Sequence, residues 1–234
     1  MLSFQKRSNQ IEIMDDLLCD GEVVHQTLRE LEIINRLLGG NYVTVSGVKK
    51  LLANKSLKEI SIADLGCGGG DILKLISNWG KRNDFEFQLI GIDANPHIIE
   101  FAKANSKEYP AIEYKSINVF SDSFKALSFD IVVATLFTHH FSDAELVQLI
   151  KTLKSQTSIG IVINDIHRHW FAYHSIRLLT KFFSKSAMVK YDAPLSVLRA
   201  FKKRELISVL AQAGVEKYSL KWKWAFRWQL VIEC

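Results

Sequence analysis

The chain has 234 residues and a net charge of +5, with 48% hydrophobic and 24% charged residues. This composition is typical of a globular protein, and the length favours one large α/β domain with a modest cap over two full domains. The three cysteines form no C-x-x-C pair, which argues against a disulfide framework or a zinc knuckle and favours a reducing, cytoplasmic setting.

The N-terminus lacks the apolar core of a signal peptide, and no apolar stretch is long enough to span a bilayer. The basic residues are scattered, and their densest clusters are residues 202–204 and the C-terminal stretch KWKWAFRW. We interpret the first cluster as the solvated start of a helix and the second as an edge strand. We therefore expect no membrane span and no nucleic-acid partner.

Residues 10–38 are predicted to be helical, because apolar residues recur there at intervals of three and four. Gly21 interrupts this pattern, and Gly39 and Gly40 end it. Another short helix is predicted over VSGVKKLLA, residues 45–53. Together these segments form a predicted helical cap over residues 1–57.

From Glu59 onward, apolar runs typical of buried strands alternate with helical patterns. This alternation implies βαβ units and a parallel, doubly wound sheet. In such sheets ligands bind at the carboxyl ends of the strands. The predicted strands are residues 59–66, 87–93, 111–119, 129–137 and 158–166, and the predicted helices are residues 71–79, 96–105 and 142–154.

Residues 166–199 interrupt the alternation and are predicted to be a lid insertion after the fifth strand. The stretch HRHWFAYHSIRLLTKFF is predicted to be an amphipathic helix, and SKSAMVKYDAPLSV leads to a helix from about Lys202 to Ala213. Two final strands, in VEKYSLKWKW and FRWQLVIE, are predicted to form an antiparallel hairpin at the sheet edge. We thus predict a seven-stranded, mostly parallel sheet in a domain over residues 58–234, with residues 10–45 and 166–199 covering the strand ends.

A glycine turn, DLGCGGGD from Asp64 to Asp71, lies between the first strand and the first helix of this domain. Such a turn lets the backbone approach a ligand closely. The dinucleotide fingerprint would place its third glycine where Asp71 stands, and Asp71 would repel a pyrophosphate at the helix start. A ligand with an adenosine but no phosphate fits better, since Asp93 at the end of the second strand can accept both ribose hydroxyls. The alternative is a tight turn that binds no ligand.

DLGCGGG, GID and the order of elements resemble the class I S-adenosylmethionine (SAM)-dependent methyltransferases, from about residue 58 to the end. The resemblance implies a Rossmann-like methyltransferase fold, SAM as the methyl donor and S-adenosylhomocysteine as the product. Many members of that family have Asp where this chain has Asn118, whose amide can still donate and accept hydrogen bonds. The implied SAM-binding residues are Asp64, Gly66, Cys67 and Gly68 around the methionine part, Asp93 at the ribose, Ala94, Asn118 and Val119 at the adenine, and Ala134 and Thr135 at the methyl-donor pocket.

Other stretches, namely EIMDD, NRLLGG, LFTHHF, NDIHRHWFAY and DAPLSVLRAF, are similar to a narrower group. This group consists of bacterial small-molecule methyltransferases often encoded beside type III polyketide synthases, which also resemble quinone-biosynthesis methyltransferases. The resemblance implies a small phenolic or pyrone-like acceptor.

Two adjacent histidines, His139 and His140, follow the fourth strand beside the expected position of the SAM sulfonium. Methyl transfer requires an aligned nucleophile and, for a phenol, a group that takes its proton. Histidine titrates near neutral pH and is suited to that task. Because adjacent residues point in different directions on a helix or strand, we favour His139 as the pocket-facing base and His140 as packing or hydrogen-bonded below it. The alternative is that both are ordinary turn residues.

A second polar cluster, Asp165, His167, Arg168 and His169, follows the fifth strand and is predicted to face the same cleft. His167 or His169 could be the base instead, and Arg168 could hold a carboxylate or phenolate of the acceptor. We predict no catalytic metal, because the H-x-H spacing on a helix points its histidines apart.

Tyr173, Asp192 and Arg199 are weaker candidates for lining the acceptor pocket. Arg199 could equally form a structural ion pair with Asp192. The oligomeric state does not follow from the sequence.

The prediction is therefore a SAM-dependent methyltransferase that acts on a hydroxyl of a small aromatic, quinone-like or polyketide-derived acceptor. Carbon methylation of an electron-rich ring requires the same donor and pocket and is the nearest alternative. A nucleic-acid base methyltransferase is less favoured, because the place of its N-P-P-Y-like segment reads ATLFTHHF here. A SAM-binding protein that has lost catalysis is the alternative from a non-enzyme class.

Overall fold

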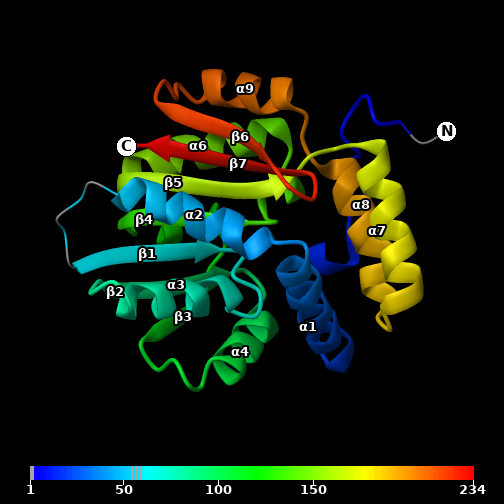
Figure 1. Cartoon of the computed structure of the whole chain (residues 1–234), viewed down its shortest axis with the longest axis horizontal. Helices are drawn as coiled ribbons and strands as arrows, with labels where there is room; N and C mark the ends of the chain where they lie inside the picture. Colours follow the sequence, from blue (N-terminus) through cyan, green and yellow to red (C-terminus); the bar gives the residue numbers. More distant parts are fainter. Residues whose placement is uncertain (1–2, 54, 56, 58) are drawn as a thin grey trace.

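A seven-stranded sheet in the order β3-β2-β1-β4-β5-β7-β6 forms the centre of the computed structural model, which describes residues 3–53, 55, 57 and 59–234 (Figure 1). β7 is antiparallel to both its neighbours, β5 and β6, and the other pairings are parallel. The predicted doubly wound, mostly parallel sheet is confirmed. The strands are β1 (Glu59–Leu65), β2 (Glu86–Asp93), β3 (Ile112–Ser116), β4 (Phe129–Thr135), β5 (Thr157–Ile166), β6 (Tyr218–Lys223) and β7 (Arg227–Glu233).

Both faces of the sheet are covered by helices, which explains why its central strands are apolar throughout. On β1, Ile60 and Ile62 face one hydrophobic cluster and Ala63 and Leu65 face the other, following the two-residue period of a strand. The helices on the first face are α2 (Gly40–Leu52), α3 (Asp71–Lys81) and α4 (Pro96–Asn105), and those on the second are α5 (Asp122–Lys125), α6 (Asp143–Gln156) and α9 (Lys203–Gln212).

Helix α2 belongs to this layer and not to a separate cap. A Cβ on Gly47 would lie 2.5 Å from a methyl group of Val162 on β5, so only glycine allows this close packing. The predicted boundary at residue 57 therefore differs from the structure, in which α2 completes the core of the sheet domain.

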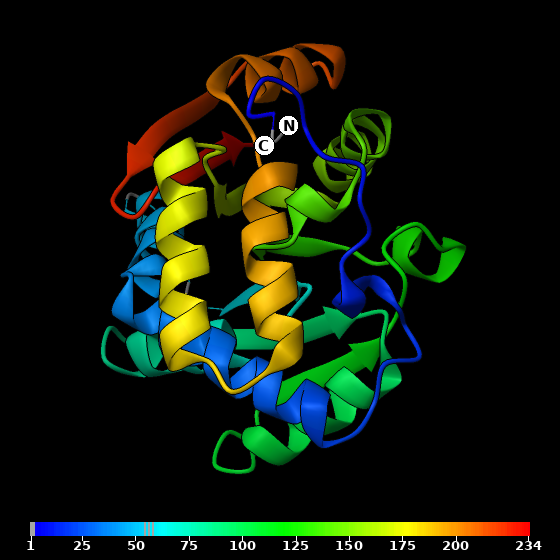
Figure 2. The same cartoon turned by 90° about the vertical axis from the view of Figure 1, so that its right-hand side faces the viewer.

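The carboxyl ends of the parallel strands point toward a lid on the right of Figure 1. The lid contains α1 (Glu22–Leu37), α7 (Trp170–Phe183) and α8 (Ala187–Arg199). Figure 2 looks onto this lid and shows the N-terminal segment passing beside α8. That segment follows α8 closely, because the Ser8 amide donates to the carbonyl of Leu198 and the Ser196 hydroxyl donates to Glu12.

Two predictions about the lid are wrong. Of the two helical segments predicted on either side of Gly21, the second forms α1, but the first forms only the short 3-10 helix η1 (Ile13–Asp15). The amides of Ile13 and Met14 donate to Asp192 on α8, so a tertiary partner replaces the helical one. The stretch SKSAMVKYDAPLSV, predicted to lead to the next helix, instead forms most of α8. Ser186 caps this helix, and Pro194 lies buried within it.

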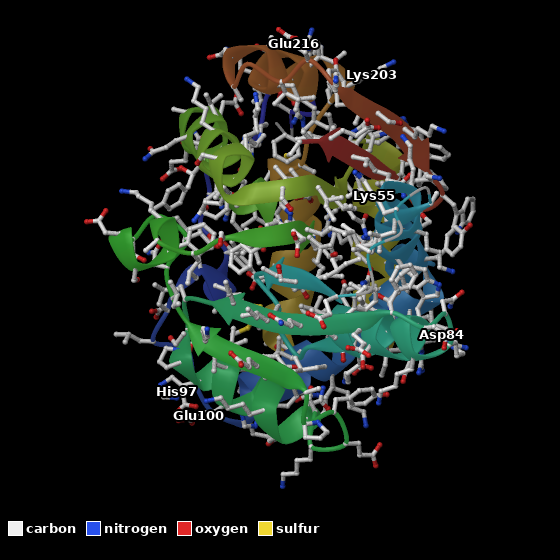
Figure 3. All side chains as sticks on the ribbon, turned by 90° about the vertical axis from the view of Figure 1, so that its left-hand side faces the viewer. Lys55, Asp84, His97, Glu100, Lys203 and Glu216 are labelled. Carbon is white, nitrogen blue, oxygen red and sulfur yellow. The ribbon has the colours of Figure 1, made fainter. Side chains whose placement is uncertain are left out.

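The end of the molecule opposite the lid has a mixed charge. Figure 3 shows this end, where Lys55, Asp84 and Glu216 are all exposed. In the part of the chain that the structure describes, no helix combines the length and the apolar character that crossing a bilayer requires.

Candidate active site

A cavity of about 1510 Å³ lies between the carboxyl ends of the strands and the lid. Its wall includes the β1–α3 turn, the residues that follow β2, β3 and β4, and parts of α1, α7 and α8. Sites for one small ligand commonly measure about 300–1,000 Å³. The cavity is therefore large enough for a donor and an acceptor together.

The glycine turn brings bare backbone to the cavity wall. Gly66 and Gly68 have φ values of 64° and 49°, which L side chains rarely adopt. A Cβ on Gly66 would also lie 2.3 Å from the ring of Phe137. The turn thus requires glycine both for its conformation and for its contact with the segment after β4.

Three carboxylates surround this turn with little compensating charge. Asp64 is buried, and among the described residues its Oδ1 has no hydrogen-bond partner. Burial, followed by the charges of Asp71 and Asp93, raises the pKa of Asp64 well above its usual range. Asp71 pairs with Lys74 at 2.7 Å, and burial also raises the pKa of Asp93. A cationic ligand group would stabilise this arrangement, whereas a phosphate would be repelled.

The structure places nearly all the predicted SAM-binding residues on one wall. Ala134 is the exception, because alternation along β4 turns it into the core beneath α6, next to cavity-facing Thr135. The residues on the wall are Asp64, Gly66, Cys67, Gly68, Asp93, Ala94, Asn118, Val119 and Thr135.

His139 and His140 both reach the cavity, from the 3-10 helix η2 (Thr138–His140). Their ring centroids lie 4.3 Å apart with a tilt of 31°. Nδ1 of His139 lies 2.7 Å from Asp165 Oδ1, and Nδ1 of His140 lies 2.5 Å from Asp15 Oδ1. The expectation that only one of the pair faces the pocket is wrong, because the tight 3-10 turn brings the two rings together on the cavity wall.

Asp165 holds this turn in place from the end of β5. Its carboxylate accepts hydrogen bonds from the Thr138 hydroxyl at 2.6 Å and from the His139 amide at 3.0 Å. Burial alone would raise the pKa of Asp165, but His139 and Thr138 outweigh it and lower the pKa to about 2. Asp165 is therefore ionised at neutral pH and fixes the His139 ring through Nδ1.

Glu12 completes the cluster and was not predicted from the sequence. It is 4% exposed, and its Oε1 lies 3.7 Å from His139 Nε2. Burial raises the pKa of Glu12 to about 7. The sequence signal was an acidic residue within the apolar stretch IEIM, which lies in the segment predicted to be helical.

Arg199 reaches the cavity wall but is held by protein groups. Its guanidinium forms an ion pair with Asp15 and donates to the carbonyl of His140 at 2.6 Å. The alternative pairing with Asp192 does not occur, because the Asp192 carboxylate accepts the backbone amides of η1.

Arg168 lies away from the cavity, which contradicts its predicted role in acceptor binding. Its side chain is fully buried and forms an ion pair with Glu205 at 2.5 Å. It also donates to the backbone carbonyls of Phe4, Gln5 and Ala200. All these contacts join the N-terminal segment and α9 to the end of β5, so Arg168 is a structural residue.

His167 and His169 also lie outside the cavity wall, contrary to their predicted roles. The His167 ring packs against Trp228 and the His169 ring stacks on Phe226, each at a centroid distance of 4.9 Å. His169 Nδ1 accepts the Phe171 amide and caps α7. The chain after β5 turns toward the β6–β7 hairpin, which removes both rings from the strand ends.

Tyr173 is likewise absent from the main cavity. It is buried in the α7–α8 interface and packs edge-on against Phe4 at 5.7 Å. Its predicted role in acceptor binding is contradicted by this packing.

Arg227 is a cavity residue that the sequence did not single out. It is 5% exposed and lines the cavity at the start of β7. Within the described ranges, its Nε and Nη1 have no hydrogen-bond partner. Burial lowers the pKa of Arg227 to about 10, and it remains a cation at neutral pH. The only sequence signal was its place in the amphipathic stretch FRWQLVIE.

Comparison with known proteins identifies a methyltransferase domain in part of the chain. A family model described as "Methyltransferase domain" matches residues 62–160, which is less than half of the chain. The match begins in β1 and ends in β5, and so covers the glycine turn and both histidines of η2. A search of curated protein sequences finds no match.

Solved methyltransferase structures share the fold at low sequence identity. The plantazolicin methyltransferase BpumL, in complex with a triazolic desmethylPZN analog and SAH, has a TM-score of 0.67 and 15% identity, over 88% of this chain and 90% of BpumL. Human N-acetylserotonin methyltransferase in complex with SAM has a TM-score of 0.62 and 16% identity, over 92% of this chain and 56% of the human chain. The CMeT domain of the citrinin polyketide synthase has a TM-score of 0.56 and 15% identity, over 75% of this chain and 46% of that chain. The chain thus spans almost all of the first protein and about half of the other two. These likenesses show that the chain has a Rossmann-like methyltransferase fold.

Proposed function

We propose that this protein is a SAM-dependent methyltransferase that methylates a hydroxyl of a small aromatic, quinone-like or polyketide-derived acceptor. The observation that carries the proposal is the unpaired, buried carboxylate of Asp64 beside the glycine turn, with Asp93 at the end of the next strand. The free thiols of Cys19, Cys67 and Cys234 fit the reducing, cytoplasmic setting that we include in the proposal.

The charge of the turn supports SAM as the donor. SAM carries a cationic sulfonium and a cationic amino group and has no phosphate, so it suits a wall formed by Asp64, Asp71 and Asp93. Asp93 is suited to accept the ribose hydroxyls, and Asn118 and Val119 border the adenine position. The methyltransferase-domain match and the SAM or SAH named with two of the similar structures add support.

The remaining cavity wall supports a small aromatic acceptor. Phe137, Phe141, Phe171 and Phe226 provide an aromatic lining between η2 and the lid. Arg227 supplies an unpaired cation on the same wall, suited to a phenolate or carboxylate of the acceptor. The acceptor would therefore be planar and apolar, with at least one acidic group.

The reaction would be an in-line displacement at the methyl carbon. The acceptor oxygen forms a bond to the methyl carbon as the carbon–sulfur bond breaks, and S-adenosylhomocysteine leaves with the electron pair. The hydroxyl proton passes to the cluster of Glu12, His139 and His140. Asp165 occupies Nδ1 of His139, so Nε2 is the nitrogen available to take that proton.

Other acceptors would use the same donor site. Carbon methylation of an electron-rich ring is the closest, and one similar structure is a polyketide-synthase CMeT domain. A nucleic-acid acceptor is disfavoured, because aromatic residues line the cavity and the basic residues are scattered along the chain.

Labelled methyl transfer tests the proposal. The protein is incubated with SAM carrying a labelled methyl group and a panel of phenols, pyrones and hydroxyquinones, with single-stranded RNA as the comparator. We expect label in at least one phenol or pyrone, with the NMR shift of an O-methyl group. Label in RNA alone, or in no acceptor despite SAM binding, would contradict the proposed acceptor class.

A further inference from the structure

Glu12, His139 and His140 converge from two distant parts of the chain. One ring nitrogen of each histidine and one carboxylate oxygen of Glu12 all lie within 4.8 Å of one another. All three residues line the cavity, and Glu12 and His139 are almost fully buried. Two imidazoles and one carboxylate are a donor set that proteins use for divalent transition metals.

The partners of the two rings have the arrangement typical of metal-binding histidines. A histidine that binds a metal through one nitrogen usually donates its other N–H to a carboxylate or carbonyl, which fixes the ring. Here Nδ1 of His139 faces Asp165 at 2.7 Å, and Nδ1 of His140 faces Asp15 at 2.5 Å. Both rings are therefore held by carboxylates with Nε2 left as the ligand atom.

The atoms left free point to a missing partner. Across the described residues, Glu12 Oε1 and His139 Nε2 are buried with no hydrogen bond, although they lie 3.7 Å apart. Buried polar atoms are rarely left without a partner. Ser196 holds the other Glu12 oxygen at 2.8 Å, which directs Oε1 toward the two rings.

The local charges also favour a divalent cation. Glu12, Asp15 and Asp165 contribute three carboxylates to the cluster, whereas Arg199 contributes one guanidinium. Arg199 pairs closely with Asp15, whereas its Nε lies 3.7 Å from Glu12 Oε1, which is too far for a hydrogen bond. When ionised, these four side chains carry an excess of two negative charges, which a divalent cation would balance.

We propose that Glu12, His139 and His140 form a binding site for one divalent transition-metal ion of the zinc type. The nitrogen donors favour Zn²⁺ or Co²⁺ over Mg²⁺ and Ca²⁺, which prefer oxygen ligands. Three protein ligands leave a coordination position open toward the cavity.

The bound cation would be the partner of the acceptor oxygen. This step rests on the proposed function. The acceptor hydroxyl would occupy the open coordination position of the cation, which would lower the pKa of the hydroxyl. Its proton would be released to water in the cavity, and the oxyanion would attack the methyl group. His139 would then act as a ligand. If the cluster holds no cation, His139 remains the proton acceptor, so this inference can fail while the proposed function stands.

Metal titration of the tag-free protein tests the site. The full chain is treated with a chelator, dialysed, and titrated with Zn²⁺, Co²⁺ and Mg²⁺ by calorimetry, with Co²⁺ binding also followed by visible absorption. We expect one Zn²⁺ or Co²⁺ per chain, intense Co²⁺ bands from low coordination, and much weaker Mg²⁺ binding. Glu12→Gln and His140→Gln should each weaken Zn²⁺ binding about 100-fold, and Asp165→Asn about 10-fold to 100-fold.

The second histidine pair provides the matched control. The double variant His167→Gln/His169→Gln removes two histidines that lie outside the cavity and should bind Zn²⁺ as the wild type does. Unchanged Zn²⁺ affinity in folded Glu12→Gln and His140→Gln would overturn the proposal, as would loss of binding in the control variant. Circular dichroism establishes that each variant is folded. The wild-type Co²⁺ titration needs no variant, and the absence of intense Co²⁺ bands at saturation would also overturn the proposal.

S-Adenosylhomocysteine titration of the same samples separates the two proposals. The metal site alone would be overturned if the protein binds S-adenosylhomocysteine, still transfers methyl groups after chelation, and does not bind Zn²⁺. Zn²⁺ binding that depends on Glu12, without any binding of S-adenosylhomocysteine or SAM, would overturn the proposed function alone.

Discussion

The two histidine pairs of this protein occupy equivalent places in the sequence and different places in the structure. His139 and His140 follow β4, whereas His167 and His169 follow the adjacent strand β5. The first pair lines the cavity, with each Nδ1 against a carboxylate. The second pair packs against the aromatic side chains of Trp228 and Phe226.

The difference arises from what each strand meets at its end. After β4 the chain makes a tight 3-10 turn against Asp165, which keeps it at the mouth of the sheet. After β5 the chain pairs with Phe201 and the end of the hairpin, where the His167 amide donates to the carbonyl of Phe226. Whether a polar residue at the carboxyl end of a parallel strand reaches the cavity therefore depends on the partners that hold it.

Replacing one histidine of each pair by glutamine should give the largest difference in the rate of methyl transfer. His139→Gln should lower the rate of methyl transfer by about 10²-fold to 10⁴-fold, because it removes the group that activates the acceptor oxygen. His167→Gln should change the rate by less than about twofold, because that ring contacts only protein. Initial rates of S-adenosylhomocysteine release, with the best acceptor of the panel, measure both. Equal losses in the two variants would contradict the comparison.

The buried ion pair of Arg168 and Glu205, beside the second histidine pair, should contribute to the free energy of unfolding. Glu205→Gln leaves Arg168 buried without its counter-charge and should lower the free energy of unfolding by about 3 kcal/mol at pH 7, with SAM affinity unchanged. Glu216→Gln, at an exposed site, is the matched control and should have little effect. Urea unfolding measures both, and a Glu205 variant as stable as the wild type would show that the pair contributes little.

The stability difference for Glu205 should depend on pH. Burial alone would raise the pKa of Glu205, but hydrogen bonds from Arg168 and from the Lys202 amide outweigh it and lower the pKa. The contribution is therefore complete above the pKa of an unfolded Glu, about 4.3, and disappears as the pH falls through the lower folded value. Unfolding curves of wild type and Glu205→Gln should converge in acid, and a constant difference down to about pH 2 would contradict this assignment.

Two arginines extend the comparison to the acceptor. Arg168 is paired with Glu205, whereas Arg227 has no ion pair with any residue that the structure describes. Arg227→Met should raise the KM for phenolate or carboxylate acceptors about tenfold, or about 1.4 kcal/mol, with unchanged KM for SAM. Stability should not fall, because Nε and Nη1 of Arg227 have no partner among the described residues. Steady-state kinetics with an anionic acceptor and its neutral analogue measure the effect. An equal rise in KM for both acceptors would show that Arg227 does not recognise the anion.

The smallest effect on the rate is expected at Thr138, which holds Asp165 beneath the first histidine pair. Thr138→Val removes one hydrogen bond to Asp165 and should lower the rate about twofold to tenfold, as expected for a bond worth about 0.5–1.5 kcal/mol. Thr180, whose hydroxyl donates only within α7, is the control, and Thr180→Val should leave the rate unchanged. A Thr138 variant with the wild-type rate would mean that His139 needs no fixed orientation.

The sheet and the donor wall could be predicted from the sequence because their signals are local. Buried strands appear as continuous apolar runs, and a strand, a glycine turn and Asp93 at the next strand end follow one another along a single stretch of chain. Asp64, Gly66, Gly68 and Thr135 consequently lie on the predicted wall. Ala134 does not, because it is the neighbour of Thr135 on an alternating strand.

The acceptor side could not be predicted because its contacts join distant segments. Ser196 on α8 holds Glu12 at the cavity by a hydrogen bond, and Glu205 on α9 holds Arg168 away from it by an ion pair. Neither pairing leaves a periodic pattern in the sequence. Residues of the stretches EIMDD, LFTHHF, NDIHRHWFAY and DAPLSVLRAF nevertheless meet around His139 and His140.

Calorimetric titration with SAM and with S-adenosylhomocysteine tests the central claim, that the wall around Asp64 and Asp93 binds the methyl donor. Wild type and Asp93→Ala are titrated side by side, with and without an acceptor from the panel. The account predicts binding of both ligands to the wild type, with Kd values on the order of micromolar, and loss of that binding in Asp93→Ala. No binding of either ligand to the wild type under both conditions, or equal binding to the variant, would contradict it.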